Sequence, residues 1–120
     1  MKTILLIDDD EDLLALLELH LKITGYECLV ATDGKQAQQQ LELKQPDLLI
    51  LDMMMPVLNG LDFLIWLRQT HSLEVPVLAL TGMTLGQTEA KLWTLGVKSV
   101  LFKPVAPQQL IQEIKKILLD

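Results

Sequence analysis

The sequence is poor in several residue types, and each scarcity excludes a class of protein. Cysteine occurs once, at Cys28, which excludes an internal disulfide and a CxxC redox or zinc motif and favours a cytoplasmic location. Lys and Arg number 10 against 16 Asp and Glu, for a net charge of −6. This acidic balance disfavours direct binding to nucleic acid or to an anionic membrane surface. No apolar run approaches the roughly 18 residues that a membrane-spanning helix needs.

The remaining composition predicts a single folded unit. Half of the 120 residues are hydrophobic, and no long Ser, Pro or Gly tract interrupts the chain. A chain of this length and apolar fraction can build one sizeable core. We therefore expect residues 1–120 to form one domain without an interdomain linker.

Short apolar runs alternate five times with longer segments of helical periodicity. The predicted strands are 3–7, 26–31, 48–51, 77–81 and 99–102. The predicted helices are 11–24, a segment opening at 33–34, a segment opening at 59–60, 84–95, and a last helix with Pro107 in its first turn. Five strand–helix units predict an α/β fold, a five-stranded parallel sheet flanked by five helices, because parallel strands need long right-handed crossovers.

Polar residues follow the predicted strands at their carboxyl ends. Three acids, residues 8–10, follow the first strand, Asp52 ends the third, Thr81-Gly82 ends the fourth, and Lys103-Pro104 follows the fifth. In a doubly wound parallel sheet, sites form outside these ends of the strands. We therefore expect carboxylates, a hydroxyl and an ammonium to meet at one edge of the sheet.

Several carboxylates at one edge need a cation. Like charges about 4 Å apart repel by about 4 kcal/mol at an effective dielectric of 20. Magnesium prefers oxygen ligands and keeps waters, which fits a few carboxylates with room for a phosphoryl oxygen. Asp52 is the best-placed nucleophile for a phosphoryl group, while Thr81 and Lys103 are placed to contact the phosphoryl oxygens.

Four short motifs together carry a resemblance to a known family. They are IDD at 7–9, LDMMMPVLNG at 51–60, TG at 81–82 and KP at 103–104. In this order and spacing, over the whole chain, the sequence resembles the receiver domain of two-component response regulators, of the chemotaxis-regulator kind. The resemblance implies a flavodoxin-like fold with strand order 2-1-3-4-5.

The resemblance also implies roles for individual residues. Asp52 would be the phosphoacceptor. Asp9 would bind Mg²⁺ directly, Asp8 chiefly through water, and Met54 through its backbone carbonyl, beside Asp52 itself. Thr81 and Lys103 would hold the phosphoryl oxygens, and the Lys103–Pro104 bond would be cis.

The implied function is a phosphorylation-controlled switch and not an enzyme in the usual sense, although such a domain assists its own phosphorylation and dephosphorylation. A sensor histidine kinase or a histidine phosphotransfer protein would donate the phosphoryl group, and a downstream protein would read the change. The last helix lacks arginine, so a charged dimer face is poorly supported and we expect a monomer before phosphorylation.

The sequence departs from the family pattern at three positions. Val100 stands where many members carry Tyr or Phe, so the usual aromatic switch is in doubt. Met54 and Met83 stand two residues after the acceptor and two after the threonine, where neither can activate a water. We expect slow self-dephosphorylation for this reason.

Three other functions compete with the switch. A phosphorylation-independent interaction module of the same fold is the main alternative. Its expected mark, loss of an acid, Thr or Lys from the site, is missing from this sequence. A phosphohydrolase of the haloacid dehalogenase type would need an acid at Met54. A flavodoxin-like cofactor binder would need a phosphate loop after the first strand, where the acids at 8–12 would repel phosphate.

Overall fold

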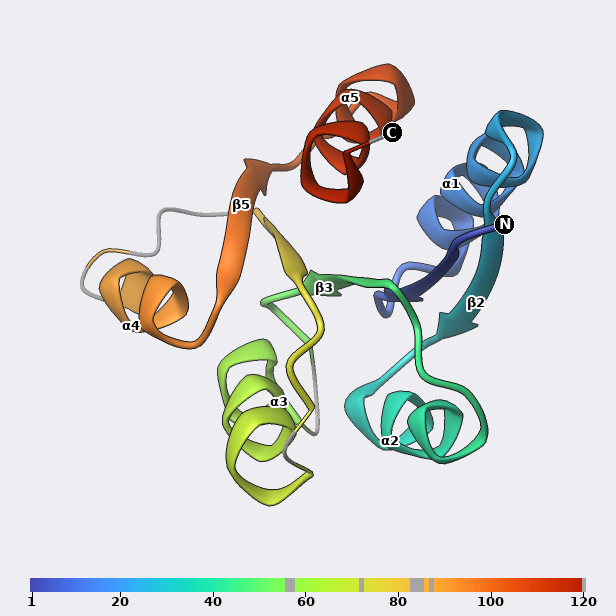
Figure 1. Cartoon of the computed structure of the whole chain (residues 1–120). Coiled ribbons are helices and arrows are strands. Elements are labelled where there is room, and N and C mark those ends of the chain that lie inside the picture. The colour runs from blue at the N-terminus through green and yellow to red at the C-terminus, as the bar shows by residue number, and fades with distance from the viewer. Residues whose placement is uncertain (56–57, 72, 83–85, 87, 120) are drawn as a thin grey trace.

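The computed structural model describes residues 1–55, 58–71, 73–82, 86 and 88–119, which form a parallel five-stranded sheet between two layers of helices (Figure 1). The strands are β1 (Thr3–Ile7), β2 (Glu27–Ala31), β3 (Leu48–Asp52), β4 (Val77–Thr81) and β5 (Val97–Phe102). The helices are α1 (Glu11–Thr24), α2 (Gly34–Leu43), α3 (Gly60–Ile65), α4 (Thr88–Thr94) and α5 (Pro107–Leu118). The strand order β2-β1-β3-β4-β5 confirms the expected topology.

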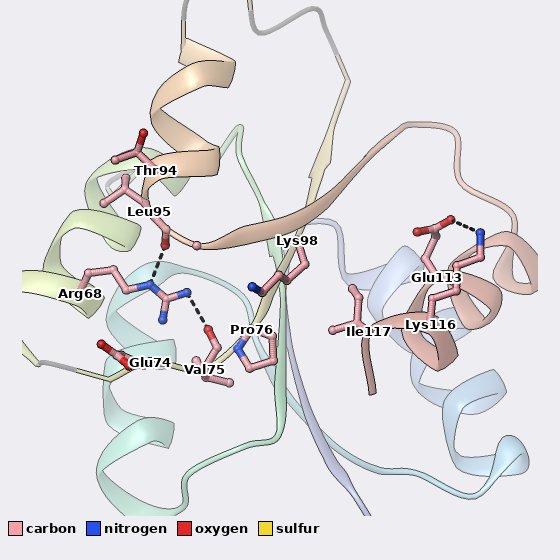
Figure 2. A pocket seen from close by; sticks show the side chains of 11 residues that line it. Arg68, Glu74, Val75, Pro76, Thr94, Leu95, Lys98, Glu113, Lys116 and Ile117 are labelled. Atoms are coloured by element: carbon pink, nitrogen blue, oxygen red, sulfur yellow. Dashed lines mark hydrogen bonds and ion pairs between the residues drawn. The ribbon is translucent and has the colours of Figure 1, made fainter. Parts of the chain in front are cut away.

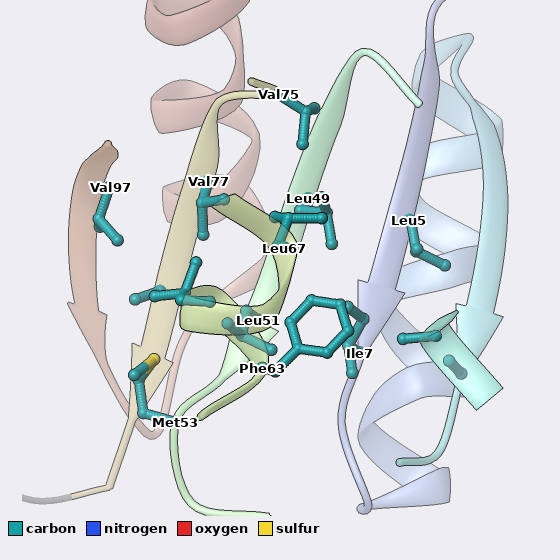
Figure 3. Packing of buried hydrophobic residues seen from close by; sticks show 14 of the residues in the cluster. Leu5, Ile7, Leu49, Leu51, Met53, Phe63, Leu67, Val75, Val77 and Val97 are labelled. Carbon is teal, nitrogen blue, oxygen red and sulfur yellow. The ribbon is translucent and has the colours of Figure 1, made fainter. Parts of the chain in front are cut away.

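The core consists of two apolar layers, one on each face of the sheet. Successive residues of a strand point to opposite faces, so Leu49 and Leu51 of β3 join one layer while Leu48 and Ile50 join the other. The first layer packs under α2, α3 and α4, with Phe63 of α3 buried in it (Figure 3). The second layer packs under α1 and α5. Both faces of the central strands are thus covered, which explains their uninterrupted apolar runs.

Side-chain caps set where three helices begin. Asp10 accepts a hydrogen bond from the backbone N–H of Leu13 at 3.1 Å, and Asp33 and Asn59 cap α2 and α3 in the same way. Such caps satisfy N–H groups that have no partner within the helix. Gly25 ends α1 with φ of 111°, a left-handed conformation that glycine adopts readily. The expected helix starts at residues 11, 33–34 and 59–60 are confirmed.

Two predicted element starts are wrong by two residues or more. β5 begins at Val97 and not at residue 99, and the β4–β5 register shifts so that Val77 pairs with Val97 while Leu78 pairs with Ser99. The exposed Lys98 interrupts the apolar run on which the sequence prediction relied. The fourth helix begins at Thr88, since Gly86 lies in a turn with φ of 57°. Residues 84 and 85 of the predicted helix lie outside the described residues.

The third helix ends differently from a regular α-helix. The chain continues from Ile65 into a π-helical turn, Trp66–Thr70, and His71 donates its backbone N–H to the carbonyl of Trp66 at 2.9 Å. The wider turn changes the directions in which the following side chains point. None of the helices in the described ranges is long and apolar enough to span a bilayer.

The single thiol gives a direct test of this core. Cys28 is buried on β2, and desolvation, with a smaller contribution from Glu18, raises its pKa to about 12. Because the thiolate is the reactive form, we expect a thiol reagent at pH 8 to modify the native protein at least about a hundredfold more slowly than the denatured chain. Ellman's reagent with and without denaturant measures this. Complete modification of native protein within minutes would contradict the burial of Cys28.

Candidate functional site

The sheet brings the predicted polar residues to its carboxyl edge. Asp52 is the last residue of β3 and Thr81 the last of β4, while Asp8 and Lys103 directly follow β1 and β5. The backbone ladder continues past the strand ends: Asp8 N–H donates to the Ala31 carbonyl at 3.1 Å, and Lys103 N–H donates to the Thr81 carbonyl at 2.8 Å. Residues far apart in sequence are therefore positioned by main-chain hydrogen bonds.

Asp52 lies at the centre of this edge. Its side chain is almost completely buried. One carboxylate oxygen, Oδ1, accepts a hydrogen bond from the backbone N–H of Met54 at 3.0 Å. The other, Oδ2, lies 3.5 Å from Lys103 Nζ. The first contact fixes the plane of the carboxylate, and the second places a positive charge beside the remaining oxygen.

Asp8 shares the ammonium of Lys103. Asp8 Oδ1 accepts a hydrogen bond from the backbone N–H of Asp10 at 2.9 Å, and Oδ2 lies 2.8 Å from Lys103 Nζ. That last contact is a close ion pair, and Oδ2 is a buried oxygen whose partner among the described residues is this ammonium. Such an oxygen is suited to a further cationic or water ligand.

Three carboxylates form one cluster. Asp8, Asp9 and Asp52 each offer an oxygen within 4.8 Å of the others, and Asp9 is exposed while the other two are buried. We call these three residues the acid cluster. Three negative charges and the single positive charge of Lys103 leave a formal charge of −2. All-oxygen donors, one solvent-open side and this residual charge fit a hard divalent cation such as Mg²⁺.

Burial and neighbouring charges shift the pKa values of Asp52 and Lys103. Desolvation, with the nearby charge of Asp8, raises the pKa of Asp52 to about 6 despite the opposing effects of the Met54 N–H and Lys103. Burial disfavours the charge on Lys103, but Asp8 and Asp52 outweigh it and raise the pKa of the ammonium. Without a bound cation, the site therefore holds charge at a cost to the folded state.

The remaining predicted residues lie at or beside this edge. Thr81 is fully buried at the end of β4, and a Cβ added at Gly82 would meet no heavy atom within 4 Å. Met54 contributes its backbone N–H to Asp52, and its side chain is exposed. The Lys103–Pro104 bond is cis, as expected. Met83, expected to influence phosphate lifetime, lies outside the described residues.

Strand β5 carries one feature that the sequence reading missed. Val100, expected to depart from the family pattern, is half-buried against the layer under α3 and α4. Phe102 pairs with Thr81 in the register of β4 and β5, and its side chain is about half exposed. Because side chains two residues apart on a strand share a face, the position of Val100 was a signal that could have placed the ring of Phe102 on this face beside Thr81.

Comparisons with known proteins agree with this geometry. The family model for the response regulator receiver domain matches residues 4–115. The transcriptional regulatory protein CpxR of Escherichia coli is 42% identical over 118 residues, covering 98% of this chain and 50% of CpxR. PhoP of Bacillus subtilis, a transcriptional regulatory protein of alkaline phosphatase synthesis, is 35% identical over 98% of this chain and 48% of PhoP. The chain spans about half the length of these relatives.

Solved structures show the same fold. The chemotaxis protein CheY4 of Vibrio cholerae aligns with a TM-score of 0.90 and 27% identity over 98% of both chains. The response regulator TrrA of Thermotoga maritima, solved with Mg²⁺ and beryllium fluoride, aligns with a TM-score of 0.84 and 27% identity over 98% of this chain and 99% of TrrA. This chain belongs to the response regulator receiver domain family, and the expected family and phosphoacceptor function class are confirmed.

The raised pKa of Asp52 predicts that this residue destabilises the metal-free protein. A carboxyl whose pKa rises from 3.8 in the unfolded chain to about 6 in the folded one costs no stability below about pH 4. The free energy of unfolding then falls as the pH rises from about 4 to about 6, because the carboxyl of the unfolded chain releases its proton at a lower pH than that of the folded chain. We expect Asp52→Asn to raise the free energy of unfolding by about 1 to 3 kcal/mol at pH 7 without Mg²⁺.

Urea denaturation at several pH values measures this difference. The gain from Asp52→Asn should disappear near pH 4 and shrink when Mg²⁺ stabilises the wild-type protein. Asp62→Asn is the matched control. Asp62 lies on α3, where its backbone N–H donates to the Asn59 side chain, and it is not part of the acid cluster. A variant less stable than wild type at pH 7 without metal would contradict the electrostatic account.

Close packing around Gly60 gives a steric test of the backbone at Asp52 and Met53. A Cβ at this position would lie 2.6 Å from Met53 Cα and 3.0 Å from the Asp52 carbonyl oxygen. We expect Gly60→Ala to lower the free energy of unfolding by about 1 to 3 kcal/mol through overpacking, although alanine is the better helix former. It should also weaken Mg²⁺ binding, measured by calorimetry. Gly82→Ala, which meets open space, should change the free energy of unfolding little.

Proposed function

We propose that this chain accepts a phosphoryl group on Asp52 and works as a magnesium-dependent signalling switch. The observation that carries the proposal is the buried carboxylate of Asp52, oriented by the Met54 N–H and bordered by both Lys103 and the acid cluster. A carboxylate in this setting is an oriented nucleophile with counter-charges already in place. Residues 1–120 would form a single receiver domain.

In the proposed step, an Asp52 oxygen attacks the phosphorus of a phosphohistidine. A new P–O bond forms to Asp52 as the P–N bond breaks, and the departing imidazole keeps the electron pair of that bond while its other nitrogen carries a proton taken up from water. Because Oδ1 accepts the Met54 N–H, Oδ2 is the oxygen with the freer approach. The raised pKa of Asp52, about 6, leaves the carboxylate mainly ionised at neutral pH.

Mg²⁺ is the proposed cofactor. Asp8, Asp9 and Asp52 would hold it with carboxylate oxygens, Asp8 chiefly through water, and Met54 with its backbone carbonyl. When bound, the ion neutralises negative charge on the carboxylates and on the incoming phosphoryl oxygens. The all-oxygen donor set and the residual charge of the acid cluster support this assignment.

Thr81 and Lys103 would contact the phosphoryl oxygens. Lys103 Nζ lies within reach of Asp52 and carries a charge that its two acidic neighbours stabilise. Thr81 ends the strand next to Asp52 and would donate its hydroxyl to a second oxygen. A hydroxyl and an ammonium on two flanking strands would hold the phosphoryl group from the side of β4 and β5.

The proposed partners follow from the family. Receiver domains of response regulators interact with histidine kinases and with downstream effectors. For this chain we propose a cytoplasmic sensor–regulator pair, with a histidine kinase or a phosphotransfer protein as donor and a protein as target. The net charge of −6 argues against direct contact of this domain with nucleic acid. We further propose a monomer before phosphorylation, and a switch that assists its own phosphorylation without turning over a substrate as an enzyme does.

Intact mass spectrometry tests the proposal. After incubation with Mg²⁺ and acetyl phosphate, we expect one added phosphoryl group on the wild-type protein. The adduct should be absent from Asp52→Asn and from a sample with EDTA, because the first lacks the nucleophile and the second lacks the cation. Asp10→Asn is the matched control, since Asp10 caps α1 and should leave phosphorylation intact.

The opposite result would favour the alternative function. Suppose that calorimetry detects Mg²⁺ binding but that neither acetyl phosphate nor phosphoramidate adds a phosphoryl group. The chain is then a phosphorylation-independent interaction module. An adduct that persists in Asp52→Asn would move the acceptor to another residue.

A further inference from the structure

A pocket of about 920 Å³ opens at the amino edge of the sheet, at the opposite ends of β4 and β5 from the acid cluster (Figure 2). Val75 and Pro76 come directly before β4, Gly96 comes directly before β5, and Ile117 lies in the last turn of α5. Sites for small molecules typically have volumes of about 300 to 1,000 Å³. The pocket is therefore large enough for a small organic ligand.

Arg68 forms one wall of this pocket and is fixed by the backbone around it. Its guanidinium donates three hydrogen bonds to carbonyls: Nε to Leu95 at 2.7 Å, Nη1 to Leu73 at 2.6 Å, and Nη2 to Val75 at 2.6 Å. Figure 2 shows two of these contacts. A Cβ added at Gly96 would lie 3.0 Å from Nη2, so glycine permits the close approach. The guanidinium is thus positioned before any ligand binds.

The positive charge of Arg68 is not neutralised by these contacts. All three acceptors are neutral carbonyls, and no carboxylate in the described part of the chain forms an ion pair with the guanidinium. Burial lowers the pKa of Arg68, although the charge of Glu74 opposes this shift. A guanidinium nevertheless stays protonated at neutral pH. This wall of the pocket therefore keeps a positive charge with which an anion can pair.

Lys98 supplies a second positive charge. It is an exposed residue of β5, and Figure 2 shows its side chain between Arg68 and the residues of α5. No ion pair joins Lys98 to an acid among the residues that the structure describes. Lys116, in contrast, is paired with Glu113 at 3.3 Å, and the Ser99 hydroxyl donates to the same carboxylate at 3.0 Å. Glu113 is thus already partnered, while Arg68 and Lys98 are available to a ligand.

The charge of the pocket lining is opposite in sign to that of the whole chain. Three bases and two acids line the pocket, whereas the chain has 10 Lys and Arg against 16 Asp and Glu. The bases are Arg68, Lys98 and Lys116, and the acids are Glu74 and Glu113. Apolar side chains form much of the remaining wall: Val75, Pro76, Leu95 and Ile117. One excess positive charge beside apolar walls fits a monoanion with an apolar body.

We propose that this pocket binds a small monocarboxylate with an apolar body, and that the carboxylate lies between Arg68 and Lys98. The apolar body lies against Pro76 and Ile117. A carboxylate carries the single charge that the lining can neutralise, whereas a phosphate monoester carries about 1.5 to 2 charges at neutral pH. The inference goes beyond the proposed function, because this site needs neither Mg²⁺ nor a phosphoryl group.

An NMR titration with 4-phenylbutyrate tests the site on the wild-type protein. We expect saturable chemical-shift changes with a Kd below about 1 mM. They should be centred on the backbone amides of Val75, Gly96, Lys98 and Ile117. The neutral 4-phenylbutyramide lacks the charge, and acetate lacks the apolar body. Each should bind at least about tenfold more weakly, because it loses one of the two interactions.

Two variants should change the affinity in opposite directions. Lys98→Gln removes a cation beside the carboxylate and should raise the Kd for 4-phenylbutyrate at least about fivefold. Glu74→Gln removes an acid near Arg68 and should lower that Kd about twofold or more. Lys91→Gln is the matched control, because Lys91 is an exposed residue of α4 that does not line the pocket. It should leave the Kd unchanged.

Several outcomes would overturn the site. They are the absence of saturable shift changes up to about 10 mM 4-phenylbutyrate, equal binding of all three compounds, and an unchanged Kd in Lys98→Gln. Shift changes centred on the acid cluster would also overturn it. The comparison of the three compounds on the wild-type protein decides the inference even where a variant fails to fold. The proposed function is tested separately by mass spectrometry, so either can fail without the other.

Discussion

The ion pair of Lys103 with Asp8 and Asp52 is the interaction on which the rest of the site depends. Three carboxylates within 4.8 Å of one another would repel strongly in a half-buried environment, and the ammonium offsets only part of that repulsion. Burial, together with the remaining repulsion from Asp8, raises the pKa of Asp52 to about 6. The fold therefore maintains a site that a divalent cation and a phosphoryl group can complete.

The sheet can carry this unfavourable site because its stability comes from elsewhere. Two apolar layers cover both faces of β1, β3 and β4, and the parallel ladder continues beyond the strand ends to Asp8 and Lys103. Main-chain hydrogen bonds thus position the charged side chains at the edge of a rigid, fully packed scaffold. The apolar layers and the charged side chains thus lie in different parts of the molecule.

The two edges of the sheet are held in different ways. At the carboxyl edge, side chains contact one another and their charges determine the chemistry. At the amino edge, Arg68 donates hydrogen bonds to three backbone carbonyls and joins three segments. The α4 segment connects the two edges and buries a single described side chain.

The sequence by itself determined the fold class, the order of the elements and the identity of the acid cluster, because hydrophobic period, capping residues and strand-end polar residues are local properties. It could not determine how the acids at 8–10 divide into a buried ion-pair partner, an exposed cluster member and a helix cap. It also missed the register shift in β5 and the partners of Arg68. Only the tertiary structure decided these, since burial, charge separation and access to distant backbone carbonyls depend on segments that meet after folding.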